Sequence, residues 1–99
     1  MVKFQLTKKA VQDLNRIWDY TYETWSEDQA DDYYQMLLSR CNDVANKPTL
    51  GKQYPQVKDG LLGIKANKHI IFYRVFDSKR IQIIRILHGR MDIASRLKD

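Results

Sequence analysis

Two consecutive amphipathic stretches constrain the fold of this chain more than any other feature. Apolar residues recur at intervals of three and four over residues 8–24 and again over residues 30–45, which is the spacing of one helical face. The other side of the first helix is expected to carry polar residues: Asp13, Asn15, Arg16 and Asp19. Thr7 and Ser26 are placed to cap the two helices, and Pro48 follows the end of the second. Because only two or three residues separate them, the helices must fold back as an antiparallel hairpin that shares its apolar faces.

Alternating and apolar runs predict four strands around this hairpin, at residues 2–6, 61–65, 68–76 and 81–88. Residues 48–60 hold both prolines and two of the four glycines, a composition typical of an irregular loop. The order β-α-α-β-β-β predicts one α+β domain over residues 1–99, an antiparallel sheet packed on one face by the helical hairpin.

A tight turn centred on residues 78 and 79 would pair His69 with His88 and so fix which side chains share a face. One face would carry Ile70, Phe72, Arg74, Phe76, Ile81, Ile83, Arg85 and Leu87. The other would carry His69, Ile71, Tyr73, Val75, Gln82, Ile84, Ile86 and His88. The second face has no formal charge and is expected to meet the helices, whereas the face with the arginines looks outward or into a groove. A slip of one residue would exchange the two faces.

Charge is divided unequally along the chain. Residues 1–50 carry 6 basic and 8 acidic side chains, a net of −2, and residues 51–99 carry 11 and 4, a net of +7, which together give +5. The second half is therefore a candidate surface for nucleic acid, a ribosome or an acidic protein segment. Alternatively, the basic side chains only keep exposed strands soluble and unpaired. The candidate basic set is Lys65, Lys68, Arg74, Arg85, His88, Arg90 and Arg96.

Several kinds of site are not predicted. His69, His88 and Cys41 are isolated in sequence, so we expect no metal or cofactor site, a structural role for the histidines and a core position for Cys41. Acidic residues at the start of the second helix are expected to form a charged surface: Glu27, Asp28, Asp31 and Asp32. The tryptophans and tyrosines of the helices could stack on bases, but their spacing favours the hairpin core. With His88 or an arginine as the acid, a metal-free ribonuclease stays conceivable.

The compartment can also be anticipated from the sequence. One cysteine excludes an internal disulfide and fits a reducing cytoplasm. No apolar run is long enough to span a membrane, and the first residues lead into a strand rather than a signal peptide. We therefore expect a cytoplasmic protein without a membrane partner.

Five segments resemble one known family in the same order along the chain. Residues 17–21 and 25–30 resemble the first helix and capped turn of ParE-type toxins, which belong to the RelE/ParE toxin–antitoxin superfamily. Residues 47–51 resemble the loop after their second helix, and residues 69–75 and 84–92 resemble their last two strands. The resemblance spans nearly the whole chain.

This resemblance implies a toxin encoded beside a labile antitoxin, whose other end is usually a DNA-binding dimer. Within the superfamily, RelE-like members cut messenger RNA in the ribosome, whereas ParE-like members poison DNA gyrase by binding. By rough alignment the strand positions that are basic in the nucleases fall on Leu61, Gly63 and Ile70, and only Arg90 persists. The RelE-like nucleases often also use a tyrosine near the C-terminus, whereas residues 93–99 of this chain contain no tyrosine or histidine. The resemblance therefore favours a gyrase inhibitor that is not an enzyme, with no catalytic residues.

The candidate target-binding residues are Arg74, Arg85, Arg90, Met91 and Asp92. Alternatively, Arg90 and Asp92 form a local ion pair and contact no target. Two other hypotheses stay open: a ribosome-dependent ribonuclease, and an inert relative that binds only its antitoxin. No direct sequence-specific binding of nucleic acid is expected.

Overall fold

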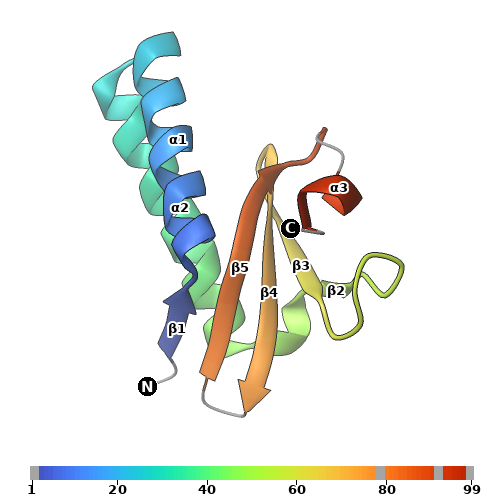
Figure 1. The fold of residues 1–99 in the computed structure, drawn as a ribbon. Coiled ribbons are helices and arrows are strands. Elements are labelled where there is room, and N and C mark those ends of the chain that lie inside the picture. Colours follow the sequence, from blue (N-terminus) through green and yellow to red (C-terminus); the bar gives the residue numbers. More distant parts are fainter. Residues whose placement is uncertain (1–2, 78–79, 91–92, 98–99) are drawn as a thin grey trace.

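The computed structural model describes residues 3–77, 80–90 and 93–97 of the chain. Its elements follow in the order β1 (Lys3–Leu6), α1 (Lys8–Thr24), α2 (Glu27–Asn46), the 3-10 helix η1 (Pro48–Leu50), β2 (Lys52–Gln53), β3 (Leu62–Ala66), β4 (His69–Asp77), β5 (Arg80–His88) and α3 (Ile93–Leu97) (Figure 1). The α+β class and the β-α-α-β-β-β core order are confirmed. β2, η1 and α3 are additional short elements, of which the first two lie in the segment expected to be an irregular loop.

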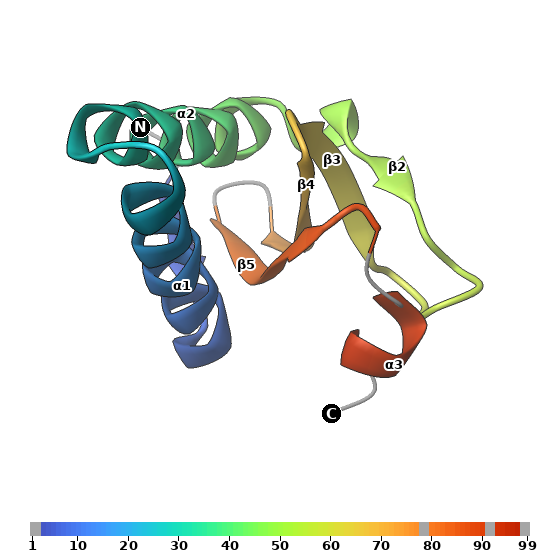
Figure 2. The same cartoon turned by 90° about the horizontal axis from the view of Figure 1, so that it is seen from above.

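The helical hairpin begins and ends where the capping residues predict. The hydroxyl of Thr7 accepts a hydrogen bond from the backbone N–H of Ala10, and that of Ser26 accepts one from Gln29. Both helices lie on one face of the sheet and run antiparallel, whereas α3 lies on the opposite face (Figures 1 and 2). The predicted single-face cover by a hairpin is therefore confirmed.

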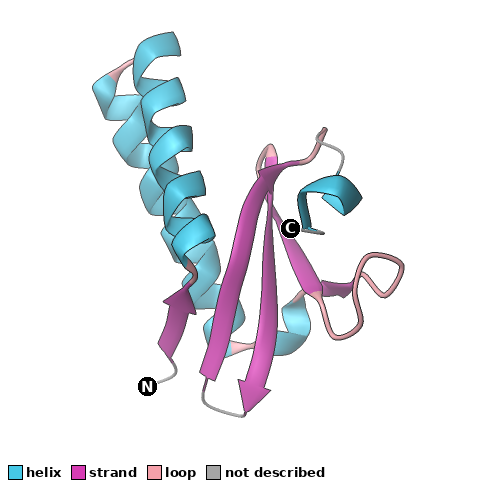
Figure 3. Cartoon of the chain, viewed as in Figure 1, coloured by secondary structure: helices cyan, strands magenta, loops and turns pink. Residues whose placement is uncertain are grey.

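The sheet has the strand order β1-β5-β4-β3-β2. The pairs β3–β4 and β4–β5 are antiparallel, as expected, and so is the pair β2–β3. In contrast, β1 pairs with β5 in parallel, from Lys3 opposite Arg80 to Leu6 opposite Ile83. The complete sheet is therefore mixed. Figure 3 shows the long connection between β2 and β3, which passes around the edge of the molecule next to α3.

Part of the predicted register between β4 and β5 is wrong because β5 contains a β-bulge. His69 lies opposite His88 and Phe72 opposite Arg85, as predicted, but the next pair is Tyr73 with Ile83, so Ile84 is the extra residue. An extra residue changes the phase of the alternation between faces. Ile81 and Ile83 consequently join the core beneath the helices, whereas Gln82 and Ile84 lie on the open face. Their predicted faces were wrong, while those of Ile71, Tyr73, Arg74 and Arg85 were right.

Each face of the sheet has its own core. The larger core lies between the helices and the sheet and includes Leu14, Leu37, Cys41, Ile71 and Tyr73. The smaller core lies on the open face, where Leu61, Phe72 and Leu87 are covered by side chains of the β2–β3 connection and α3. Burial raises the pKa of Cys41 to about 12, so this residue is a neutral core thiol, as predicted.

Two predictions about α1 were wrong. Val11, Tyr22 and Trp25 belong to the apolar stripe but are 41%, 50% and 68% exposed. The closed end of the hairpin projects beyond the end of the sheet, where no strand covers it (Figure 1). Asp13, expected on the polar side, is only 6% exposed. The helix therefore packs through Ala10, Asp13 and Leu14 of its first half and leaves much of its second half uncovered.

Candidate interaction surface

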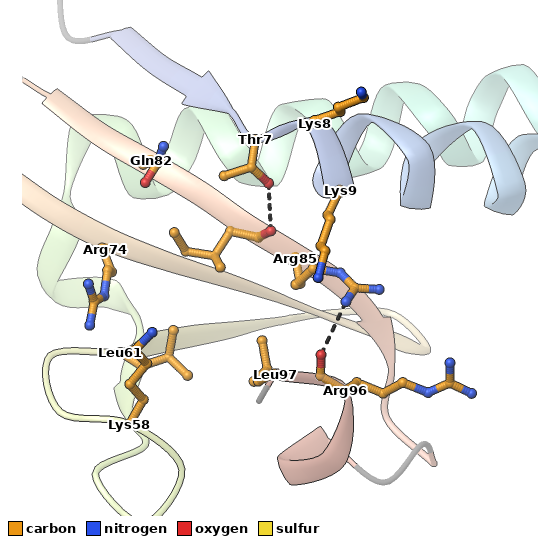
Figure 4. A pocket seen from close by; sticks show the side chains of 11 residues that line it. Thr7, Lys8, Lys9, Lys58, Leu61, Arg74, Gln82, Arg85, Arg96 and Leu97 are labelled. Carbon is orange, nitrogen blue, oxygen red and sulfur yellow. Dashed lines mark hydrogen bonds between the residues drawn. The ribbon is translucent and has the colours of Figure 1, made fainter. Parts of the chain in front are cut away.

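A groove of about 410 Å³ opens on the face of the sheet opposite the helical hairpin. Its walls are the start of α1, the strands β4 and β5, the β2–β3 connection and α3 (Figure 4). Six cationic side chains line it: Lys8, Lys9, Lys58, Arg74, Arg85 and Arg96. No carboxylate is among the described residues of the lining.

The floor of this basic groove is apolar. Leu61 is buried, and Ile84 and Leu97 are half-buried, each packing on the small core of the open face. A surface with an apolar centre and a charged rim has the composition of a protein-binding site rather than of an ordinary solvated face. The groove can therefore bind a ligand that combines negative charge with apolar groups.

A buried ion pair forms one wall of the groove. Nε of Arg85 donates to Oδ2 of Asp13 at 2.7 Å, and its terminal nitrogen donates to Oδ1 at 3.0 Å. The backbone N–H of Ile86 donates to the same carboxylate at 3.0 Å, and Arg85 also donates to the carbonyl oxygen of Arg96 at 3.2 Å (Figure 4). Arg85 thus joins α1, β5 and α3. Its guanidinium positions the groove wall rather than pointing freely at a partner.

Asp13 is a buried structural position beside the groove that the sequence prediction missed. It lies three residues after Ala10 and four before Ile17, so it occupies the apolar stripe of α1. An acidic residue on such a stripe needs a cationic partner because burial of an unpaired charge is costly. This spacing was the available signal, and it indicates a buried pair without naming Arg85 as the partner.

The other predicted target-binding residues are placed differently. Arg74 is half-buried in the groove and donates to the carbonyl oxygen of Asp59 at 3.1 Å, which holds the β2–β3 connection. Arg90 is exposed, lies outside the groove lining, and donates its backbone N–H to Nδ1 of His88 at 3.1 Å. Met91 and Asp92 lie outside the described residues. The groove therefore brings together Arg74 and Arg85, but not Arg90.

The two histidines are neighbours, as the register predicted. Their ring centroids are 5.2 Å apart, and Nδ1 of His69 forms a 2.6 Å hydrogen bond with the hydroxyl of Tyr33. Burial, assisted by His88, lowers the pKa of His69 from 6.5 to about 4. His69 is consequently neutral at pH 7 and joins α2 to β4, which confirms a structural role. Among residues 3–77, 80–90 and 93–97, no three ligating side chains cluster to hold a metal ion.

The rest of the predicted basic set lies elsewhere. Of this set, Lys65 and Lys68 line a second hollow of about 590 Å³ beside β3, together with His69, Arg40 and Lys52, whereas His88 and Arg90 line neither hollow. The basic half of the chain is thus divided between two surfaces. The described acidic residues at the start of α2 are exposed, as predicted. In the described part of the chain, no helix is both long and apolar enough to cross a membrane.

The fold is shared with chains of two solved toxin–antitoxin structures. The chromosomal ParDE toxin–antitoxin system from P. aeruginosa contains a chain that aligns with a TM-score of 0.75 at 23% identity, covering 89% of this chain and 96% of that one. The toxin–antitoxin complex RelBE2 from Mycobacterium tuberculosis gives a TM-score of 0.68 at 17% identity, covering 88% and 96%. At these identities the likeness establishes the fold alone.

Sequence comparison establishes the family. Residues 4–93 match the family described as ParE toxin of the type II toxin-antitoxin system parDE. Toxin ParE1 of Mycobacterium tuberculosis (strain H37Rv) is 34% identical over 95 residues, covering 96% of this chain and 97% of that protein. Toxin ParE1 of Caulobacter vibrioides is 32% identical over 97 residues, covering 98% and 99%. The chain belongs to the ParE toxin family of type II toxin–antitoxin systems, as its sequence motifs predicted.

Proposed function

We propose that this toxin acts by binding DNA gyrase and holding it on cleaved DNA, without catalysing a reaction itself. Membership of the ParE family supports a toxin. The observation that carries the proposed mode of action is the basic groove, where six cations surround an apolar floor. Such a surface suits an acidic region of a protein, or a protein with its bound DNA.

The proposed contacts include the predicted residues, with different roles. Arg74 lines the groove directly, and Arg85 acts through its position between Asp13 and α3. Arg90, Met91 and Asp92 follow the end of β5 in sequence and remain candidate contacts. Lys58 and Arg96, which also line it, extend the proposed surface.

The chemistry of the open face favours binding over RNA cleavage. A ribonuclease needs donors aimed at the charge that develops on the phosphate. The positions that correspond by rough alignment to nuclease cations are a buried Leu61, Gly63 and a half-buried Ile70. Gly63 lies so close to Tyr54 that an added Cβ would be 2.7 Å from its ring, which leaves no room there for a catalytic side chain. This arrangement supports a non-enzymatic toxin.

A cognate antitoxin is the second proposed partner. An acidic, partly disordered antitoxin segment that orders on binding would complement the net charge of +7 in residues 51–99. Its other end is expected to bind DNA, whereas the toxin itself binds no specific nucleic-acid sequence. Because both proposed partners, gyrase and the antitoxin, are expected in the cytoplasm, we propose that the toxin acts there. Complex formation should raise the melting temperature of the toxin by mass action.

The test is a trapping reaction. Purified toxin is added to supercoiled plasmid, gyrase and ATP, and detergent and protease then reveal trapped breaks. We expect linear DNA to accumulate with toxin concentration and to disappear when the antitoxin encoded beside the toxin is added first. Intact, normally supercoiled DNA would contradict gyrase as the target. Message cleavage in a parallel translation reaction would instead favour the ribonuclease hypothesis.

A further inference from the structure

The closed end of the helical hairpin, residues 18–32, carries aromatic side chains that the fold does not bury. Trp18, Tyr22 and Trp25 follow one another at helical spacing, and Tyr22 and Trp25 are 50% and 68% exposed. The rings of Trp18 and Tyr22 are stacked, with centroids 5.2 Å apart and planes 12° from parallel. We call these three residues the aromatic stripe. Contiguous exposed apolar groups of this kind mark interaction sites.

The aromatic stripe is held in place from the second helix. Nε1–H of Trp18 donates a 2.9 Å hydrogen bond to Oδ1 of Asp31, which lies on α2. The indole is thereby fixed before any ligand arrives, and Tyr22 stacks on it. A preorganised aromatic surface loses little conformational entropy on binding and therefore makes a good anchor for a partner.

Charge around the stripe restricts the kind of partner. Residues 17–39 contain six acidic side chains and no lysine, arginine or histidine. All six are exposed: Asp19, Glu23, Glu27, Asp28, Asp31 and Asp32. This field repels the phosphates of nucleic acids and anionic lipids, and it also opposes the pairing of two such ends from two copies of the chain. Lysine and arginine side chains, by contrast, gain both ion pairs and contacts with the aromatic faces.

We propose that the aromatic stripe and its acidic rim bind a segment of a partner protein that carries lysine or arginine beside apolar side chains. This surface lies at the end of α1, whereas the basic groove begins at Thr7, Lys8 and Lys9. At 1.5 Å per helical residue the stripe begins about 14 Å from Lys9, at Trp18, and ends about 24 Å from it, at Trp25. A basic partner segment and an acidic partner can therefore occupy the protein together. The inference does not depend on gyrase being the target.

The chain provides its own probe for a test. Its two tryptophans, Trp18 and Trp25, are both in the stripe, so intrinsic tryptophan fluorescence reports on this surface alone. Purified toxin is titrated with an end-blocked peptide of lysine, leucine and alanine. Two comparison peptides carry glutamate in place of every lysine, or serine in place of every leucine. We expect a saturable emission change with the first peptide that weakens as salt is added, and roughly tenfold or weaker binding of the other two.

Variants locate the binding. Trp25→Ala and the charge reversal Glu23→Lys with Asp28→Lys should each weaken the lysine–leucine peptide about tenfold. Phe76→Ala removes another exposed aromatic ring, 57% exposed at the end of β4, and should leave the affinity unchanged. Since all these positions are exposed, thermal melting should show folded proteins.

Three results would overturn the proposal. The first is no saturable change with the lysine–leucine peptide, and the second is equal binding of its glutamate counterpart. The third is quenching of the tryptophans by a DNA oligonucleotide, which would make the stripe a base-stacking surface. Because the peptide titrations contain no gyrase, none of these results bears on the proposed gyrase activity, which the trapping reaction tests separately.

Discussion

The two faces of the sheet use the same strands for different purposes. Beneath the helices, Ile71, Tyr73 and Ile83 are fully buried, and the polar atom in this layer is satisfied: the Tyr73 hydroxyl donates to the carbonyl of Pro48 at 2.6 Å and accepts from the N–H of Gly51 at 2.9 Å. On the open face, Phe72 and Leu87 are covered mainly by short or irregular segments and bordered by cations. The first face holds the fold together, and the second presents charge.

Substitutions on the two faces should therefore have separable effects. Changes in the helix-covered layer should alter the free energy of unfolding, because they leave cavities or unpaired polar groups. Charge changes in the basic groove should alter partner binding while stability is kept, because exposed cations contribute little to folding. The ion pair of Asp13 and Arg85 lies between the two faces, so its removal should alter both the free energy of unfolding and partner binding.

The largest loss of stability is expected for Asp13→Ala. It leaves the guanidinium of Arg85, whose side chain is 12% exposed, without its carboxylate partner, and it removes the acceptor for the N–H of Ile86. Breaking such a pair costs about 3–5 kcal/mol. Urea unfolding measures the loss, with Asp19→Ala on the exposed side of the same helix as the control. Equal urea midpoints for Asp13→Ala and Asp19→Ala would show that the ion pair of Asp13 and Arg85 does not stabilise the fold.

Tyr73→Phe should have the next largest effect. The ring remains, but the carbonyl of Pro48 and the N–H of Gly51 lose their shared partner, at about 1–3 kcal/mol. Tyr54→Phe is the matched change on the open face, where the ring packs edge-on against Phe72, and should cost less than about 0.5 kcal/mol. A larger loss for Tyr54→Phe than for Tyr73→Phe would show that the helix-covered face does not contribute more to stability.

Stability should also depend on pH through His69. Its pKa is lowered by burial to about 4 in the folded protein, below the ordinary 6.5, so the unfolded chain binds the proton more readily. Unfolding free energy is therefore unaffected by this group above about pH 6.5 and falls as the pH drops toward 4. Because His69 is partly accessible to solvent, the loss should be about 1–2 kcal/mol.

Urea midpoints measured at several pH values check this expectation. His69→Gln, which cannot titrate, should flatten the profile between pH 6.5 and 5, while His88→Gln should flatten it less. Identical profiles for the parent protein and His69→Gln would mean that another group causes the acid sensitivity.

The smallest effect on stability is expected for the basic groove. Lys58→Glu combined with Arg74→Glu reverses two cations of the lining, and Arg74 gives up only its exposed hydrogen bond to Asp59. The free energy of unfolding should change by about 0.5 kcal/mol or less per substitution. Thermal and urea unfolding of the double variant beside the parent protein measure this. A loss comparable to that of Asp13→Ala would make the groove part of the structural core.

Local patterns in the sequence predicted most of the fold. Apolar spacing and the hydroxyls of Thr7 and Ser26 gave both long helices, whose ends depend on hydrogen bonds within a few residues. The last two strands were predicted because their apolar runs end at turn residues. The bulge at Ile84 was not predicted, since a run of consecutive apolar residues looks the same with either alternation phase.

Features that depend on distant segments were less accessible. Asp13 and Arg85 are 72 positions apart, so spacing could suggest a buried acid but not its partner. The exposure of Trp25 depends on how far the sheet extends beneath the hairpin, which helical periodicity does not encode. The predicted basic set did not include the groove residues Lys8, Lys9 and Lys58, because they lie on α1 and in a loop, whereas that set came from the last strands and the C-terminal segment.

The gyrase trapping reaction, run with matched variants, tests whether the basic groove is the surface that acts on gyrase. The Lys58→Glu and Arg74→Glu double variant is compared with Lys47→Glu, a reversal of an exposed cation outside the groove lining. We predict that the folded double variant needs more than about tenfold higher concentration to trap the same linear DNA, while Lys47→Glu acts like the parent protein. Full trapping activity in the double variant would contradict the account.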